Sequence, residues 1–106
     1  MSDKVLHLDT SSFNQTIASS KLVLVDFWAP WCGPCRMLGP TIDALADTVA
    51  DKAIICKVNV DENPGIAQQY GVNMIPTIIF FKKGERIGQC NSATKEALLA
   101  KINEMA

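Results

Sequence analysis

The chain has 106 residues, 48% of them hydrophobic and 20% charged, and its formal net charge is −1. This length predicts a single domain over residues 1–106, and this composition excludes an intrinsically disordered chain. A near-neutral chain without a basic stripe also gives no electrostatic support for a nucleic-acid partner.

The chain opens with a strand pattern followed by a short helix pattern. The segment Val5–Leu8 predicts the strand, and the polar residues 9–11 offer N-cap oxygens for a helix that buries Phe13 and Ile17. Next, Leu22–Trp28 is a nearly continuous apolar run, rich in β-branched and aromatic side chains. Such a run is typical of a central strand that is covered on both faces.

A turn and a long helix follow this strand. The turn is Ala29–Pro34, which is rich in residues that break regular structure. The helix is predicted from apolar residues at helical spacing, namely Leu38, Ile42, Leu45 and Val49. Pro40 lies inside this pattern and should kink the helix. Ala53–Val60 then predicts another strand.

A second short helix is predicted after this strand. Asn63 is its expected N-cap residue and Pro64 its first helical residue. Ile66 and Tyr70 lie on one face of the predicted helix, and Gly71 marks its end.

The last third of the chain predicts a hairpin and a final helix. Thr77–Phe81 is a strand pattern, Lys82–Glu85 a hairpin turn, and Arg86–Cys90 a weaker strand. The final amphipathic helix carries Leu98, Ile102 and Met105. The order βαβαβαββα favours an α/β fold, with a largely parallel sheet covered on both faces and an antiparallel hairpin at its end.

The N-terminal segment Met1–Asp9 lacks the apolar core of a signal peptide. The apolar stretch Leu22–Val25 stops at Asp26 and is far too short to cross a bilayer. We therefore expect a soluble protein of the cytoplasm with no membrane partner. Cysteines in that reducing compartment do not form a structural framework, so a close pair indicates catalysis or metal binding.

Cys32 and Cys35 form such a pair, one helical turn apart, just past the end of the second predicted strand. Sheets of this kind carry their active sites at that edge. Unpaired N–H groups and the positive end of the helix dipole favour the thiolate form of Cys32 there. A thiolate attacks disulfides, and Cys35 can then release the partner from the mixed disulfide. Gly33 allows close approach of a substrate, and Pro34 stiffens the first turn.

Trp28 and Trp31 flank the pair and can supply an apolar collar. The alternative interpretation is half of a zinc site, which needs four ligands. The remaining candidates, Cys56, Cys90 and His7, stand singly in the sequence. Redox chemistry is therefore favoured over a metal site.

Asp26 lies within the apolar strand, where a carboxylate is unfavourable. It could point outward from an edge strand, but a strand that is apolar on both faces argues against that. A buried Asp26 should have a raised pKa and could take a proton from Cys35. Lys57, on the next predicted strand, is either the partner of Asp26 or an ordinary solvated lysine, and the sequence leaves both open.

Several motifs together resemble the thioredoxin family. The segment Val25–Met37, with Trp31-Cys32-Gly33-Pro34-Cys35 at its centre, resembles the active-site signature of that family. Four further segments do so in the same order, namely Asp61–Pro64, Tyr70–Val72, Ile75–Thr77 and Lys83–Glu85. The similarity extends from Val5 to the C-terminal helix.

This resemblance implies a thioredoxin fold, a five-stranded mixed sheet of order 1-3-2-4-5 flanked by four helices. It implies a thiol–disulfide oxidoreductase that acts as a protein-disulfide reductase. Cys32 would be the nucleophile, Cys35 the resolving thiol and Asp26 the buried proton carrier. Pro76 would be cis and lie against the cysteine pair.

The resemblance also implies a flat docking surface on which the backbone of Ile75 pairs with an extended substrate. The residues expected on this surface are Trp31, Gly33, Val72, Met74, Ile75, Pro76, Asn91 and Ser92. Asn91 and Ser92 make it more polar than is usual in the family, in a segment one residue shorter. Met74 replaces a common small residue and adds flexible apolar surface.

No bound cofactor or metal is expected, because NADPH and flavin would act through a separate thioredoxin reductase. Expected clients are ribonucleotide reductase, peroxiredoxin and methionine sulfoxide reductase, and the protein is expected to be a monomer. An oxidant or isomerase of the same fold and a non-catalytic binding module are the competing functions. Cys56 is expected to be an inert buried residue, whereas Cys90 is either passive or a regulatory thiol.

Overall fold

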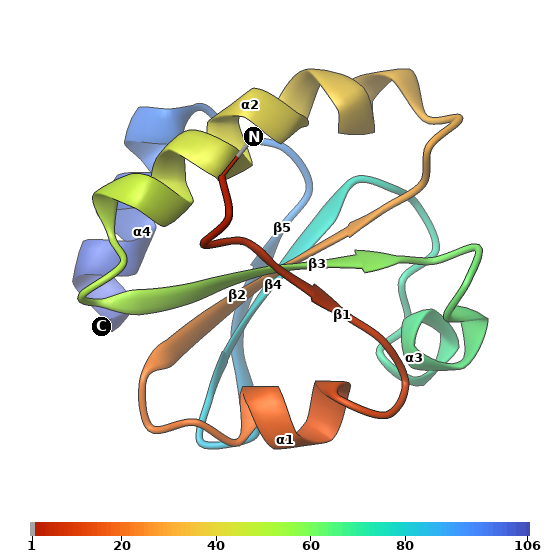
Figure 1. Ribbon diagram of the computed structural model, residues 1–106, viewed down its shortest axis with the longest axis horizontal. Helices are drawn as coiled ribbons and strands as arrows, with labels where there is room; N and C mark the ends of the chain where they lie inside the picture. The colour runs from red at the N-terminus through yellow and green to blue at the C-terminus, as the bar shows by residue number, and fades with distance from the viewer. Residues whose placement is uncertain (1) are drawn as a thin grey trace.

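A five-stranded sheet organises residues 2–106, the part of the chain that the computed structural model describes (Figure 1). In spatial order its strands are β1 (Leu6–Leu8), β3 (Ala53–Asn59), β2 (Leu22–Trp28), β4 (Thr77–Lys82) and β5 (Glu85–Cys90). β1, β3 and β2 are parallel, while β4 runs antiparallel to β2 and β5 antiparallel to β4. The expected α/β class and the order 1-3-2-4-5 are confirmed.

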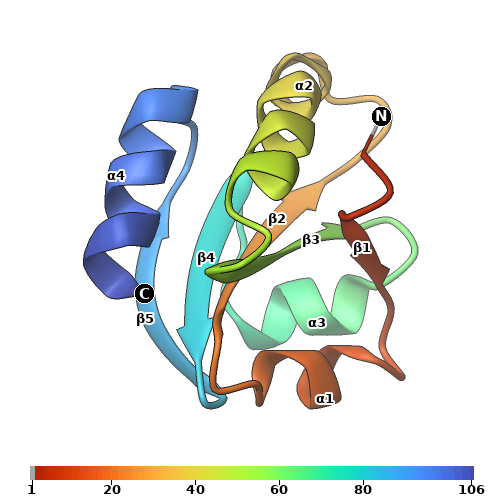
Figure 2. The same cartoon turned by 60° about the vertical axis from the view of Figure 1, so that its left-hand side comes forward.

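Helices cover both faces of this sheet, as Figure 2 shows. Those in the described range are α1 (Phe13–Ile17), α2 (Gly33–Thr48), α3 (Pro64–Gln69) and α4 (Lys95–Met105). α2 and α4 pack on one face of the sheet, and α1 and α3 on the other. Two separate apolar cores result, one on each side.

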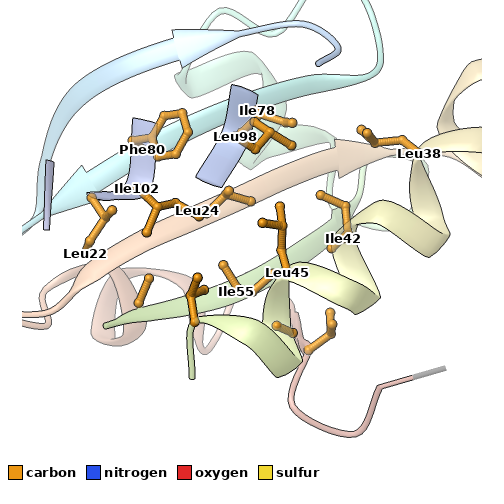
Figure 3. Packing of buried hydrophobic residues seen from close by; sticks show 14 residues of the cluster. Leu22, Leu24, Leu38, Ile42, Leu45, Ile55, Ile78, Phe80, Leu98 and Ile102 are labelled. Atoms are coloured by element: carbon orange, nitrogen blue, oxygen red, sulfur yellow. The ribbon is translucent and has the colours of Figure 1, made fainter. Parts of the chain in front are cut away.

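The alternation of side chains along β2 feeds both cores. Leu22 and Leu24 belong to the core beneath α2 and α4 (Figure 3), whereas Val23 and Val25 belong to the opposite core. Because side chains alternate between faces along a strand, Asp26 lies on the same face as Leu24, the one that α2 covers. The cysteine pair lies at the N-terminus of α2, so the fold brings Asp26 and that pair to the same side of the sheet.

The caps of the two short helices differ from the sequence prediction. Asn63 occupies the N-cap position of α3, but its side chain makes no capping hydrogen bond in the described chain. Instead its Oδ1 accepts from the backbone N–H and the hydroxyl of Thr10, at 3.1 and 3.2 Å. Likewise Asp9 accepts from the N–H groups of Ser11 and Ser12 before α1 begins. A distant loop takes up the side chain of Asn63, and the turn before α1 takes up that of Asp9, so neither residue caps its helix as the sequence pattern predicted.

The hairpin between β4 and β5 is a two-residue turn. Lys83 and Gly84 both have positive φ, at 54° and 83°, which is the geometry of a type I′ turn. The β4–β5 register shifts by one residue between Phe80 and Phe81, which leaves Ile87 out of the described ladder. The observed strands otherwise lie within one residue of the predicted bounds, and β3 ends at Asn59 rather than Val60.

α2 continues through Pro40 to Thr48, and the expected kink at Pro40 stays a prediction. The C-terminal end of α4 lies beside the far end of β4, where Lys82 Nζ donates to the Met105 carbonyl at 3.3 Å. This is the opposite end of β4 from Pro76. Among residues 2–106, no helix has the length and apolar character needed to span a membrane.

Candidate active site

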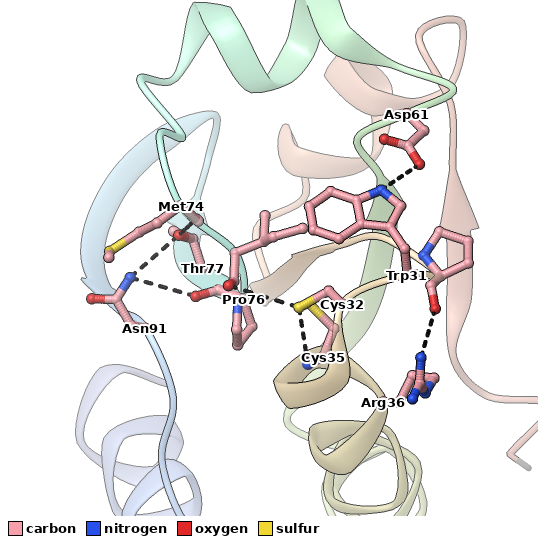
Figure 4. The surroundings of a disulfide bond; sticks show 11 residues. Trp31, Cys32, Cys35, Arg36, Asp61, Met74, Pro76, Thr77 and Asn91 are labelled. Atoms are coloured by element: carbon pink, nitrogen blue, oxygen red, sulfur yellow. Dashed lines mark hydrogen bonds between the residues drawn. A yellow bond between two sulfur atoms is a disulfide. The ribbon is translucent and has the colours of Figure 1, made fainter.

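The cysteine pair lies at the N-terminus of α2 (Figure 4). Cys32 is the N-cap residue, with φ −86° and ψ 112°, so its backbone is extended and the helix begins at Gly33. The Sγ atom of Cys32 accepts a hydrogen bond from the Cys35 backbone N–H at 3.2 Å. Pro34 has no N–H that would need a partner at this position. One sulfur therefore lies against the N–H groups of a helix N-terminus, where negative charge is stabilised.

Cys32 and Cys35 are joined by a disulfide, so the structure represents the oxidised form. Their Cα atoms are 5.2 Å apart, within the usual range for bonded cysteines. Both residues are buried, with Cys35 only 1% exposed, and Trp28, Val60 and Ile75 pack against them. The structure thus brings together the two cysteines that the sequence spacing predicted to interact.

The loop before β4 lies directly against this pair. The Ile75–Pro76 peptide bond is cis, as the resemblance implied. The Ile75 carbonyl oxygen lies 3.8 Å from Cys32 Sγ. In the disulfide this sulfur carries no hydrogen, but in the reduced form a Cys32 thiol could donate weakly to that oxygen. Pro76 itself is buried, while Ile75 is half-buried.

Exposed side chains surround the buried pair. Trp31 is 67% exposed, and its indole Nε1 donates to Asp61 Oδ2 at 2.9 Å. Arg36 donates to the Pro30 carbonyl at 3.2 Å and links the active-site turn to α2. Met74, 63% exposed, lies on the opposite side of the pair from Trp31 in Figure 4. The site therefore has an accessible and largely apolar rim.

The other residues expected at the docking surface differ in how far they are exposed to solvent. Gly33 is half-buried beside the disulfide, and Asn91 and Ser92 are exposed. Ser92 borders a shallow hollow that Pro34 also lines. Val72 is half-buried and packs against the core on the α1–α3 side.

Asp26 is completely buried on the central strand, which rules out the interpretation as an outward-pointing residue of an edge strand. Within residues 2–106 neither of its carboxylate oxygens has a hydrogen-bond partner. Burial raises the pKa of Asp26 from 3.8 to about 7, and the charge of Lys57 opposes that rise. The carboxyl group can therefore hold or release a proton near neutral pH.

Lys57 acts on Asp26 through its charge and not through a hydrogen bond, so neither interpretation that the sequence left open describes it fully. It is the register neighbour of Asp26 on β3, yet the described chain shows no ion pair between them. Its Nζ lies 4.4 Å from the centroid of the Trp28 ring, a cation–π contact. The positive charge thus acts on Asp26 through space while the indole ring of Trp28 holds it.

Cys56 and Cys90 are free thiols. Burial raises the pKa of Cys56 to about 12, so this thiol is unreactive at neutral pH. Burial also raises the pKa of the half-buried Cys90, and the charge of Lys101 acts against this. No group of three or more metal-ligating side chains occurs within residues 2–106.

Residues 4–104 match the sequence model of the Thioredoxin family. The chain belongs to the thioredoxin family. Its relatives include a thioredoxin of Chlorobaculum thiosulfatiphilum, 52% identical over 88% of this chain and 86% of the relative. Thioredoxin 1 of Synechococcus elongatus is 47% identical over 85% of each chain. The solved structure of a Malassezia sympodialis thioredoxin superposes with a TM-score of 0.87 at 40% identity, over 94% of this chain and 89% of that one.

The family and the bonded cysteine pair together establish the activity. The chain is a thiol–disulfide oxidoreductase that acts on protein disulfides. Members of the thioredoxin family use their cysteine pair without a bound cofactor. They exchange electrons with a reductase and with disulfide-bonded client proteins.

Two contacts of this thioredoxin site were not predicted from the sequence. Asp61 belongs to a segment that carried the family resemblance, yet its hydrogen bond to Trp31 was not foreseen. Asn91 was expected only as an exposed part of the docking surface. Its side-chain Nδ2 donates to the Pro76 carbonyl and to Thr77 Oγ1, both at 3.4 Å. The usable signal was that Asn91 follows the last residue of β5, close to the loop before β4.

Proposed function

We propose that this thioredoxin acts as a protein-disulfide reductase, with residues 1–106 working as one domain. Cys32 is the attacking sulfur and Cys35 the resolving one. The observation that carries the assignment is the position of Cys32 Sγ at the N-cap of α2, where it accepts the Cys35 N–H at 3.2 Å. Charge-assisted hydrogen bonds of this kind stabilise a thiolate.

The reaction transfers two electrons in two exchange steps. The Cys32 thiolate attacks one sulfur of a client disulfide, forming a mixed disulfide and releasing the other client sulfur as a thiolate. Cys35 then loses its proton and attacks Cys32 Sγ, which releases the second client sulfur. The products are the client dithiol and the Cys32–Cys35 disulfide, so the client is reduced and the pair is oxidised.

Asp26 is the acceptor for the proton that Cys35 loses. Its carboxyl group is buried, lacks a hydrogen-bond partner among the described residues, and has a pKa near 7. A base with a pKa close to the working pH suits proton transfer in both directions. Lys57, held over Trp28, supports the ionised form of Asp26.

The client docks across the rim of the site. Trp31, Gly33 and Met74 provide accessible apolar contact, and the backbone of Ile75 beside Pro76 pairs with an extended client segment. Val72, Asn91 and Ser92 complete this surface. Such backbone pairing recognises an extended chain independently of its sequence, which suits a donor with many clients.

Reducing equivalents come from an NADPH-dependent flavoprotein thioredoxin reductase. Clients are cytoplasmic proteins of the ribonucleotide reductase, peroxiredoxin and methionine sulfoxide reductase types, and the protein works as a monomer. The direction of transfer is tested by the reduction potential. A value near −270 mV supports a reductant, whereas one near −180 or −120 mV is that of an isomerase or an oxidant.

Reduction of insulin, with dithiothreitol as the electron source, tests the site assignment. Cys32→Ser should abolish catalysis, and Cys90→Ser serves as the matched control that should retain it. Cys35→Ser should accumulate mixed disulfides on Cys32, which also identifies the clients. Catalysis by Cys32→Ser at the wild-type rate would contradict the assignment.

A further inference from the structure

The side chain of Asn91 connects the end of β5 to the loop that holds cis-Pro76. Its Nδ2 lies 3.4 Å from the Pro76 carbonyl oxygen and 3.4 Å from Thr77 Oγ1, and it donates to both. The hydroxyl of Thr77 in turn donates to the Met74 carbonyl at 2.5 Å. Figure 4 shows these bonds as a short chain from Asn91 across the loop.

This connection lies just beyond the point where backbone pairing stops. The β4–β5 ladder ends with Ile78 opposite Cys90, and the following residues on the two strands are Thr77 and Asn91. Pro76 cannot extend the ladder, because it has no N–H. Beyond that point the side-chain amide of Asn91 donates to the Pro76 carbonyl oxygen and so links the two segments.

The loop that Asn91 holds is also the one nearest to the reactive sulfur. The Ile75 carbonyl lies 3.8 Å from Cys32 Sγ, and Ile75 directly precedes Pro76. Thr77 is only 2% exposed, so its hydroxyl has few alternatives to these two partners. A change at Asn91 would thus reach the backbone against which a client segment lies.

We propose that Asn91, beyond its place on the docking surface, is a positioning residue for protein clients, which acts by ordering the Met74–Thr77 loop and not by client contact alone. This inference rests on the proposed reductase function. Binding an extended segment is weaker when the receiving backbone must first be ordered, because that ordering opposes binding. A small disulfide that needs no docking segment depends far less on the loop.

The test compares two substrates of the pre-reduced protein, insulin and the small disulfide 5,5′-dithiobis(2-nitrobenzoic acid). Asn91→Asp keeps the size of the side chain but removes its N–H donors, and Asn91→Ala removes the amide altogether. In both variants the ratio of the insulin rate constant to the small-disulfide rate constant should fall about fivefold, through a higher KM for insulin. Amide hydrogen exchange at Met74, Ile75 and Thr77 should become faster.

Asn73→Asp is the matched control, since it makes the same chemical and charge change one residue before Met74, on an exposed side chain. It should leave both the ratio and the loop exchange unchanged. An unchanged ratio in the Asn91 variants, or an equal fall in Asn73→Asp, overturns the proposal. A lower ratio with unaltered loop exchange also overturns it, since Asn91 would then act through contact with the client alone. A wild-type protein that does not reduce insulin would instead refute the reductase function itself.

Discussion

The buried site of Asp26 favours the protonated form of its carboxyl group. Its pKa in the folded protein is about 7, against 3.8 for the ordinary group, and burial is the cause. The protonated carboxyl group therefore adds to the free energy of unfolding. This contribution is fully present below about pH 4 and is lost as the pH rises to about 7. One pKa unit corresponds to about 1.4 kcal/mol, so this loss reaches up to about 4 kcal/mol.

Asp26→Asn should remove this loss, because the amide stays neutral at every pH. At pH 8 the variant should be more stable than the wild type by up to about 4 kcal/mol, and near pH 3 the two should agree. The variant should also reduce insulin at least about tenfold more slowly, since the proton acceptor is missing. Urea unfolding at both pH values and steady-state rates measure the two effects.

Asp51→Asn provides the comparison for an exposed carboxylate, and it should change neither stability nor rate appreciably. An Asp26→Asn protein that is less stable at pH 8 and fully active would show that this carboxyl group is neither a destabilising charge nor a proton acceptor.

Lys57 lowers the pKa of Asp26 through its positive charge. Lys57→Met should therefore raise the pKa of Asp26 further, and the pH range in which stability is lost should move upward. Titration of the Asp26 carboxyl carbon by NMR measures the shift directly. Lys21→Met is the control. If the pKa of Asp26 were the same in the Lys57→Met and Lys21→Met variants, the ammonium group over Trp28 would have no influence on Asp26.

The sequence predicted the burial of Asp26 correctly because its neighbours on the strand are apolar on both faces. The location of Lys57 was not predictable in the same way. Its long side chain can reach Asp26, solvent or an aromatic ring, and tertiary packing decides among them. The hydrogen bonds of Asn91 were unpredictable for the same reason. Its partners Pro76 and Thr77 lie 15 and 14 residues away in the chain and meet Asn91 only in the folded sheet.

At the scale of elements, the β4–β5 hairpin combines one suitable and one unsuitable turn residue. A type I′ turn needs positive φ at both central positions, and Lys83 has φ 54° without being glycine or asparagine. Lys83→Asn should stabilise the protein by about 0.5–1 kcal/mol, because asparagine tolerates this conformation better. Thermal unfolding measures the gain.

Gly84→Ala replaces the suitable turn residue at the neighbouring position, where φ is 83°, with one that disfavours positive φ. A Cβ atom there would meet no described atom within 4 Å, so only the backbone conformation can oppose the change. We expect a loss of about 1 kcal/mol or more. Equal stability of the wild type and both hairpin variants would be incompatible with a type I′ turn.

Element types were predictable because the apolar periodicity changes from two to about 3.6 between strands and helices. The caps of α1 and α3 were harder to predict. Asn63 and Asp9 are good capping residues by type, but Asn63 bonds to Thr10 in a distant loop, and Asp9 bonds within its own turn. The register shift between Phe80 and Phe81 likewise could not be predicted from the sequence, because the residue patterns that indicate β4 and β5 are uninterrupted there.

On the scale of the whole molecule, Cys56 reports on the integrity of the core. It lies fully buried between β1 and β2, and its pKa is near 12. With Cys32 and Cys35 in their disulfide, iodoacetamide should label Cys56 only when the molecule unfolds. Its labelling in urea should therefore have the same midpoint as the loss of circular dichroism, whereas Cys90 should react at lower urea concentrations. Labelling of Cys56 in the native protein would instead show local opening of β3.

The attachment of the C-terminus to the far end of β4 has a practical consequence. Met105 is held by Lys82 at the end of the strand opposite to Pro76, so the last residues point away from the cysteine pair. A surface or probe linked through the C-terminus would leave the dithiol facing the solution. Molecules immobilised in that orientation would keep their cysteine pairs accessible to a reductase and to clients in solution.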